Sequence, residues 1–286
     1  MTIYVQPETL DEALEVLAQG PVTVAAGCTD LFPATGLPML GGPVLGGPVL
    51  DITRIRGLRG IEQTAQGWRI GAATTWTDLV AADLPPAFDM LKMAAREVGS
   101  IQIQNSATLA GNICNASPAA DGAPPLLALD AAVELGSANG RRSIPLGAFL
   151  TGPRQTDLRP GEMMTAVTIP AAAASGRSAF CKLGARKYLV ISIAMVAVRL
   201  AAVDGRVRDI AVSVGSCSPV AQRLTRLEQV LNGLPVSELA DAVTPDLVSE
   251  KLQPIADIRA SAEYRLTVAD TLICRMLAGL GAEVRK

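Results

Sequence analysis

The spacing of apolar positions predicts two amphipathic helices in the first hundred residues. Thr9 and Glu12 form a capping-box pattern, which predicts the start of the first helix. Apolar residues follow at helical spacing before Gly20-Pro21 ends the pattern: Leu10, Ala13, Leu14 and Leu17. The second helix is expected over residues 87–98, where apolar residues again share one side and Gly99 ends the run: Met90, Leu91, Ala94, Ala95 and Val98.

Short apolar runs predict strands elsewhere in the first part of the chain, at residues 22–26, 49–52, 68–72, 131–135 and 163–169. A tandem duplication, GGPVLGGPVL over residues 41–50, is interpreted as a surface loop whose second copy leads into the strand at 49–52. The proline and glycine at 160–161 mark a turn before the last of these strands.

The pattern changes after the stretch PAAAASGRS, which is rich in small residues and predicts a linker. Two apolar runs, 191–203 and 206–214, flank Asp204-Gly205 and predict a β-hairpin. Helical segments are expected around residues 222–231, 237–252 and 260–280. The natural division is an α/β domain over 1–172, a linker over 173–178 and an α+β domain over 179–286.

Two loops of small residues stand out as a place for a ligand. AAGCTDL follows the strand at 22–26, and TLAGN begins a stretch that remains poor in bulky side chains until Pro124 and Pro125. Those prolines suit the first turn of a helix. Because such loops let a ligand approach main-chain N–H groups, the sequence predicts a phosphate-containing ligand held mainly by the backbone.

Composition excludes several classes of function. The net charge of −2 and the pI near 5.4 argue against a nucleic-acid partner. No apolar run reaches the length of a membrane span, and the N-terminus lacks a signal-peptide pattern, so we expect a cytoplasmic protein. The five cysteines are widely spaced, which indicates reduced thiols and no cluster or zinc site. The chain has no histidine, which excludes Ser–His and Cys–His catalysis.

Several motifs, taken in order, match one family. They are PETLDEALEVL, AAGCTDL, LDITRIRGLRGI, WRIGAATTWTDL, TLAGN with ASPAAD after it, PGEMMTAVTIP and RASAEYRLTVADTL. On these motifs the chain resembles the FAD-binding subunits of the molybdenum hydroxylases, the family of xanthine dehydrogenase and carbon monoxide dehydrogenase. The resemblance covers nearly the whole chain.

The resemblance implies an α+β fold in two parts. The first is a FAD-binding domain of PCMH type over 1–172, whose two α/β subdomains, about 1–55 and 56–172, clasp extended FAD. The second is a C-terminal domain of the carbon monoxide dehydrogenase flavoprotein type over 179–286, with a three-stranded antiparallel sheet and helices.

The resemblance also implies two diphosphate loops. The first comprises Val24, Ala25, Ala26, Gly27, Cys28, Thr29, Asp30 and Leu31, and the second comprises Thr108, Leu109, Ala110, Gly111 and Asn112. Two loops of main-chain N–H groups can neutralise a diphosphate without a P-loop lysine. Cys28 and Ala110 stand where the family has glycines, and a positive φ at either position would cost about 1 kcal/mol.

Three further residues acquire expected roles from the resemblance. Asp121 should accept a hydrogen bond from the sugar or adenosine portion of FAD, although it can also cap the helix that follows. Val98 should lie near the adenine. Met164 should make an apolar contact with the cofactor.

The remaining expected contacts concern the flavin ring. Lys182 should donate to a flavin carbonyl or to the ribityl chain; the alternative is an ordinary ion-pairing lysine. Tyr188 and Ile191 should lie beside the isoalloxazine, although Tyr188 can equally cap a hydrophobic edge. No acid–base catalyst and no metal ligand is assigned.

The function implied is that of an oxidoreductase subunit, a flavoprotein that transfers electrons. A large molybdopterin subunit and a small [2Fe–2S] subunit would supply the other cofactors, in a heterotrimer or its dimer, and FAD would pass electrons to an external acceptor. One alternative is a stand-alone FAD oxidoreductase of the same fold. The other is a flavin-free structural or assembly subunit, which the residues at positions 28 and 110 keep open.

Overall fold

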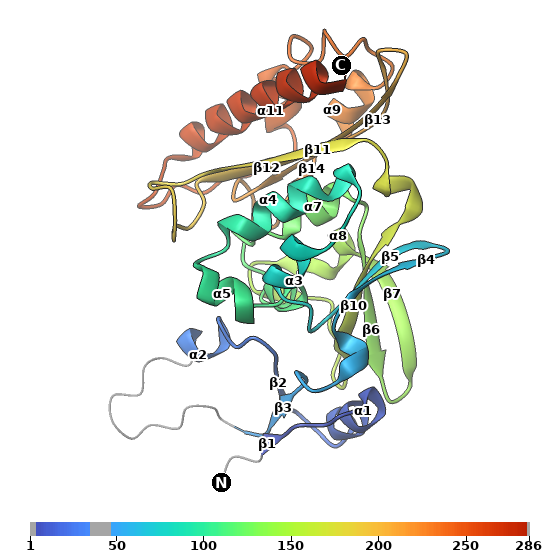
Figure 1. Ribbon diagram of the computed structural model, residues 1–286. Helices are drawn as coiled ribbons and strands as arrows, with labels where there is room; N and C mark the ends of the chain where they lie inside the picture. Colours follow the sequence, from blue (N-terminus) through green and yellow to red (C-terminus); the bar gives the residue numbers. More distant parts are fainter. Residues whose placement is uncertain (1–3, 35–46, 285–286) are drawn as a thin grey trace.

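The protein is arranged in three tiers, which Figure 1 shows from the N-terminal tier at the bottom to the C-terminal tier at the top. The structure, a computed structural model, describes residues 4–34 and 47–284. The duplicated stretch therefore lies largely outside the described residues, whereas the strand that follows it is present as predicted. Within the described residues, no helix is both long and apolar enough to cross a lipid bilayer.

The lower tier is a small parallel sheet with one covering helix. Its strand order is β1-β3-β2. Helix α1 buries Ala13, Leu14 and Leu17, as its spacing predicted. The Thr9 hydroxyl accepts a hydrogen bond from the Glu12 N–H at 3.3 Å, but the Glu12 carboxylate accepts from the N–H of Glu8. The capping box is therefore one-sided. The elements are β1 (Tyr4–Val5), α1 (Leu10–Ala18), β2 (Thr23–Ala25), α2 (Leu31–Ala34) and β3 (Val49–Asp51).

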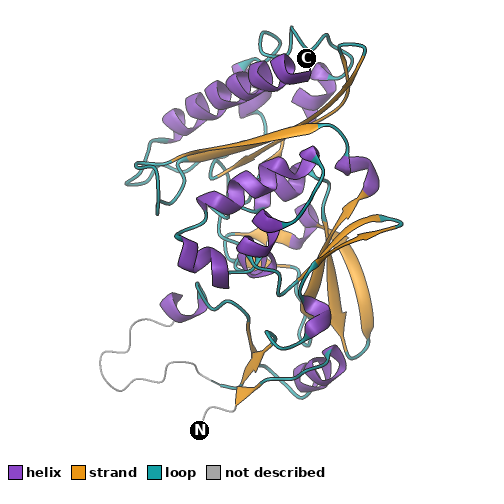
Figure 2. Cartoon of the chain, viewed as in Figure 1, coloured by secondary structure: helices purple, strands orange, loops and turns teal. Residues whose placement is uncertain are grey.

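The middle tier pairs a five-stranded antiparallel sheet, in the order β4-β5-β10-β6-β7, with short helices (Figure 2). The strands predicted near 68–72, 131–135 and 163–169 are its three central members. The elements are η1 (Arg56–Leu58), β4 (Ile61–Thr64), β5 (Gly67–Gly71), α3 (Trp76–Ala81), η2 (Pro86–Phe88), α4 (Asp89–Glu97), α5 (Ile101–Ser106), α6 (Leu109–Cys114), α7 (Ala123–Ala128), β6 (Ala132–Ser137), β7 (Gly140–Pro145), α8 (Leu146–Phe149), β8 (Leu150–Gly152), β9 (Gln155–Thr156), β10 (Met163–Pro170) and η3 (Ala171–Ala174).

The upper tier contains a sheet of three long antiparallel strands and a two-residue fourth strand, in the order β11-β12-β13-β14. The hairpin predicted at Asp204-Gly205 is confirmed, with φ of +53° and +70° at the two turn residues, as a type I′ turn requires. The elements are β11 (Arg177–Leu183), β12 (Ala194–Val203), β13 (Arg206–Gly215), β14 (Gln222–Arg223), α9 (Thr225–Leu231), α10 (Pro245–Ser249) and α11 (Ala262–Val284).

The upper sheet is covered on both faces, which explains the continuous apolar run of β12. Met195 and Ala197 pack into the core of the middle tier, beside α4 and α7. The alternate residues, Val196 and Val198, pack with α11. Strands that are buried on both faces do not need the alternation of apolar and polar residues. The C-terminal tier is therefore built directly onto the helices of the middle tier.

Two helix predictions for the upper tier were wrong in extent. Residues 237–252 contain only the short α10, because Pro245 lacks an N–H and occupies the first turn of a helix, not its interior. The segment at 222–231 becomes helical only from Thr225, because Gln222 and Arg223 pair with β13 instead. The long helix predicted at 260–280 is present as α11.

The stretch interpreted as a linker is largely ordered against the middle tier. Residues 171–174 form η3, and Arg177 begins β11. The Ser178 hydroxyl accepts from the Met90 N–H at 2.9 Å and donates to the Pro86 carbonyl at 3.0 Å. These bonds fix the first residues of β11 against the start of α4.

Truncation of Ile273, which is fully buried in α11, should destabilise the protein. We expect Ile273→Ala to lower the free energy of unfolding by about 3 kcal/mol, because it removes buried apolar surface and leaves a cavity. Ile258→Ala is the matched control, since that side chain is 97% exposed and should change the value by less than about 0.5 kcal/mol. Urea unfolding followed by circular dichroism measures both, and equal effects would contradict the packing described.

Candidate functional site

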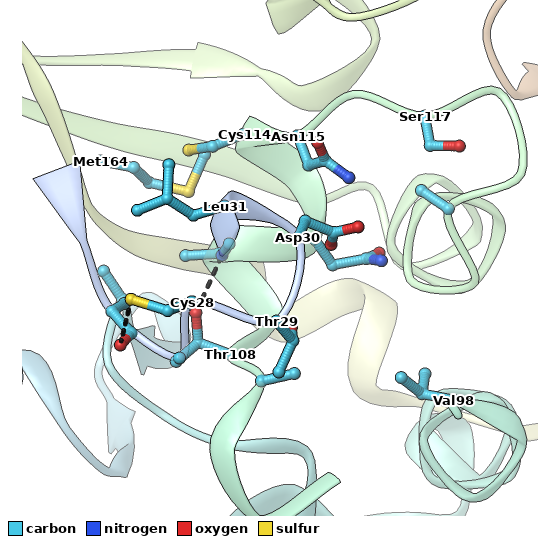
Figure 3. Close-up of a pocket in the computed structure, with 18 of the residues that line it drawn as sticks. Cys28, Thr29, Asp30, Leu31, Val98, Thr108, Cys114, Asn115, Ser117 and Met164 are labelled. Carbon is cyan, nitrogen blue, oxygen red and sulfur yellow. Dashed lines mark hydrogen bonds between the residues drawn. The ribbon is translucent and has the colours of Figure 1, made fainter. Parts of the chain in front are cut away.

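A cavity of about 620 Å³ lies where the three tiers meet. The loop after β2 forms one wall, and α6 with the loop after it forms another, as Figure 3 shows. Val190 and Ile191 of the upper tier line it as well. Both small-residue loops singled out in the sequence therefore face one space, together with the segment that precedes β12.

Gly27 brings the two loops into direct main-chain contact. A Cβ at this position would lie 2.0 Å from the Ser106 carbonyl oxygen and 2.8 Å from the Cα of Ala107. No side chain fits there. The second loop is in turn fixed to the start of α3 by two hydrogen bonds. Leu109 N–H donates to the Thr74 carbonyl and Trp76 N–H donates to the Ala107 carbonyl, each at 3.1 Å.

Cys28 adopts the left-handed backbone conformation, with φ of +56°. A glycine would adopt it freely, whereas cysteine does so at a cost of about 1 kcal/mol. Its thiol donates to the Ala26 carbonyl, and burial raises the pKa of that thiol, which keeps it protonated. Ala110 lies in the right-handed helix α6, so no such cost arises at that position.

Short polar side chains order the second loop. The Thr108 hydroxyl accepts from the Gly111 N–H at 3.0 Å and caps α6. The Asn112 side-chain carbonyl accepts from the Gly122 N–H at 3.1 Å and so connects α6 with the start of α7. Pro124 and Pro125 lie in the first turn of α7, as predicted.

Asp121 and Lys182 form a buried ion pair between the middle and upper tiers. The Lys182 ammonium lies 2.8 Å from an Asp121 carboxylate oxygen, and the two side chains are only 6% and 13% exposed. The ammonium also donates to the Glu97 carbonyl at 3.4 Å. Burial raises the pKa of Asp121 to about 6, although the charge of Lys182 opposes this shift. The sequence analysis gave each residue its own contact with FAD, whereas in the structure the two side chains contact each other.

Most of the other predicted site residues also line the cavity. Val98 and Met164 lie on opposite sides of it in Figure 3, and Ile191 lines it while remaining half exposed. Ala25 and Leu109 are buried in the core and are absent from the lining. Lys182 is also absent from the lining, although its ammonium contacts the lining residue Asp121. Tyr188 is 59% exposed and lies outside the lining, near the Lys187 ammonium.

Arg154 is a lining residue to which the sequence analysis assigned no role. It follows the Gly-Pro turn between β8 and β9 and has φ of +59°. Its N–H donates to the Ala116 carbonyl at 2.8 Å, and its guanidinium contacts the Asn115 side chain. The described lining otherwise carries acidic charge, at Asp30, Asp121 and Glu162. An anionic ligand would therefore depend on main-chain N–H groups, with Arg154 at the edge.

Comparisons with known families match both parts of the chain. Residues 1–172 match the family described as the FAD binding domain in molybdopterin dehydrogenase. Residues 179–280 match the carbon monoxide dehydrogenase flavoprotein C-terminal domain. Both results agree with the resemblance derived from the sequence motifs.

Individual proteins are similar over nearly their full length. The glyceraldehyde dehydrogenase medium chain of Sulfolobus acidocaldarius is 31% identical, over 94% of this chain and 94% of its own. The nicotine 6-hydroxylase medium subunit of Paenarthrobacter nicotinovorans is 30% identical, over 98% and 97%. Among solved structures, a chain of the carbon monoxide dehydrogenase from Hydrogenophaga pseudoflava superposes with a TM-score of 0.86 at 29% identity, over 98% and 97%.

The Asp121 carboxyl should make stability depend on pH. Its pKa is 3.8 ordinarily and about 6 in the folded chain, so folding takes up a proton between these values. The stabilisation is present below the lower value and is lost as the pH rises through the higher one. Relative to Asp121→Asn, the free energy of unfolding should fall by about 2 kcal/mol from about pH 4 to about pH 7. Urea unfolding at both pH values measures it; a constant or rising difference would contradict the shift.

Proposed function

Because the chain belongs to the family of FAD-binding flavoproteins of the molybdopterin dehydrogenases, we propose that its cavity holds extended FAD between the two small-residue loops. The observation that carries the proposal is the main-chain contact at Gly27. The wall beside it includes Gly27, Ala110 and Gly111, whose small size would let a diphosphate approach backbone N–H groups. The size of the cavity is in the range of sites that enclose a small-molecule cofactor.

The lining residues fit distinct portions of such a cofactor. The loops at 24–31 and 108–112 would hold the diphosphate, with Arg154 adding a positive charge at the edge. Asp121 would accept a hydrogen bond from a sugar hydroxyl, and Val98 would pack near the adenine. Met164 would provide an apolar contact.

The upper tier would form the side of the site nearest the flavin ring. Ile191 lines the cavity, and Tyr188 lies exposed on the same segment, where a modest movement would cover the ring. The ammonium of Lys182 donates to Asp121 outside the lining, so it would reach the ring or the ribityl chain only after a change of its side-chain conformation; from either place its positive charge would favour the reduced form. These side chains position the cofactor and limit the access of water.

The whole protein is proposed to act as an electron-transfer subunit. FAD, when bound, can accept and release electrons one or two at a time. The relatives named above are called medium chain and medium subunit, which supports an assembly with a large molybdopterin subunit and a small [2Fe–2S] subunit. FAD would connect the small subunit with an external acceptor. Of the alternatives, the flavin-free subunit is disfavoured, because positions 28 and 110 accept their residues without closing the cavity.

Two further parts of the proposal concern organisation and location. We divide the chain into a FAD-binding domain over 1–172, a connection over 173–178 and a C-terminal domain over 179–286, which the ranges of the two family matches support.

We place the protein in the cytoplasm. All five cysteines are free thiols, which supports a reducing compartment.

Substitution of Gly27 should remove FAD binding. We expect Gly27→Ala to weaken FAD binding by more than about tenfold, since its Cβ would overlap the Ser106 carbonyl. Gly57→Ala is the matched control, because nothing lies within 4 Å of a Cβ at that position. The visible absorption of each purified chain after incubation with FAD measures occupancy. Full occupancy in Gly27→Ala would show that the cofactor lies elsewhere.

The assembly can be tested by purification under native conditions. A tagged chain should copurify with two further chains, one carrying molybdenum and the other carrying iron and acid-labile sulfide. Metal analysis of the separated subunits measures this, with the tagged chain expressed alone as the control. A homogeneous flavoprotein that reduces an acceptor without any partner would instead support the stand-alone oxidoreductase.

A further inference from the structure

One buried arginine of the C-terminal helix contacts the main chain of two separate segments. Arg265 lies in the first turns of α11 and is 2% exposed. One of its terminal nitrogens donates to the Ile193 carbonyl at 2.6 Å and to the Ser216 carbonyl at 3.0 Å. The other donates to Asp257 at 2.8 Å. A lysine could not make these bonds together, since they require the planar fork of a guanidinium.

The first contact leads to one wall of the cavity. Ile193 is joined at its N–H to the Leu183 carbonyl at 2.7 Å and at its carbonyl to Arg265. These two hydrogen bonds of Ile193 therefore fix the end of the segment that connects β11 with β12. Ile191 and Val190, two and three residues earlier, line the cavity.

The second contact leads to another wall of the cavity. Ser216 N–H donates to the Pro118 carbonyl at 3.1 Å, between the lining residues Ser117 and Ala119. Ser216 has φ of +64°, a conformation that a serine keeps only when its surroundings hold it there. Its carbonyl is held by Arg265 and its N–H by Pro118, which accounts for the conformation.

We propose that Arg265 is a positioning residue that sets the separation of these two walls, and so the fit of the cofactor at this end of the cavity. The proposal rests on the proposed FAD function. Arg265 acts through the Ile193 and Ser216 carbonyls and does not itself line the cavity. Loss of either bond frees a wall to move independently of the other.

Asp257 fixes the orientation of the guanidinium. Its carboxylate accepts from the Arg259 N–H at 2.9 Å and the Ala260 N–H at 3.3 Å, and it pairs with the Arg259 side chain. These donors hold the pKa of Asp257 well below its usual range, so it remains charged opposite Arg265. Asp257→Asn would loosen Arg265 without removing it.

Arg199 offers a control with the same chemistry at another place. It is 1% exposed, donates to the Ala128 carbonyl at 3.0 Å and pairs with Asp130 and Asp209. Like Arg265, it is a buried arginine of the upper tier that donates to a main-chain carbonyl and pairs with a carboxylate. Unlike Ile193, its partners have no lining residue within three positions of them in the chain, so its replacement should cost stability without moving the walls.

The experiment compares Arg265→Lys with Arg199→Lys in the full chain, stripped of flavin and titrated with FAD. Arg265→Lys should weaken FAD binding by about tenfold and shift the visible absorption band of the bound flavin. Asp257→Asn should do so by about threefold, which keeps the test valid if Arg265→Lys fails to fold. Arg199→Lys should bind FAD within about twofold of the unchanged chain, even where its melting temperature falls equally.

Two results would overturn the proposal while the unchanged chain still binds FAD. One is an equal loss of affinity in Arg265→Lys and Arg199→Lys, which would mean that stability alone was measured. The other is an unaltered affinity and spectrum in folded Arg265→Lys. Failure of the unchanged chain to take up FAD would overturn the proposed function itself, and this inference with it.

Discussion

The architecture depends on one contact between two segments of the main chain. Gly27 of the lower tier meets Ser106 and Ala107 of the middle tier so closely that a Cβ would overlap the Ser106 carbonyl oxygen. This contact sets the two loops against each other at a wall of the cavity that includes Gly27, Ala110 and Gly111. The parallel sheet holds the first loop, and hydrogen bonds from Trp76 and Leu109 hold the second. A rigid frame thus surrounds a space in which backbone N–H groups can meet an anion.

The upper tier completes this frame through buried charges. Lys182 reaches Asp121 from β11, and Arg265 donates to the carbonyls of Ile193 and Ser216, each of which is connected to lining residues. Buried pairs of this kind add little net stability, but breaking one costs about 3–5 kcal/mol because the remaining charge is left unpaired. The Asp121–Lys182 pair therefore favours one relative placement of the middle and upper tiers. The position of the C-terminal part and the shape of the cofactor site are coupled for this reason.

The local features of the fold could be predicted from the sequence, whereas the contacts between distant residues could not. Helix α4, the hairpin at Asp204-Gly205 and the helix start at Pro124 follow from spacing and turn chemistry. The Asp121–Lys182 pair joins residues that are 61 positions apart, and no local pattern encodes it. The motifs brought both small-residue loops to notice, but only the structure shows that position 28 requires a positive φ and position 110 does not.

The central claim is that the two loops hold the diphosphate of FAD. Isothermal titration of the flavin-stripped chain with FAD and, separately, with FMN tests it most directly, because FMN has the same flavin ring but lacks the diphosphate bridge and the adenosine. We expect one FAD to bind per chain, with an FMN affinity lower by at least about 100-fold, or 2.7 kcal/mol. Equal affinities for the two flavins, or no binding of FAD, would contradict it.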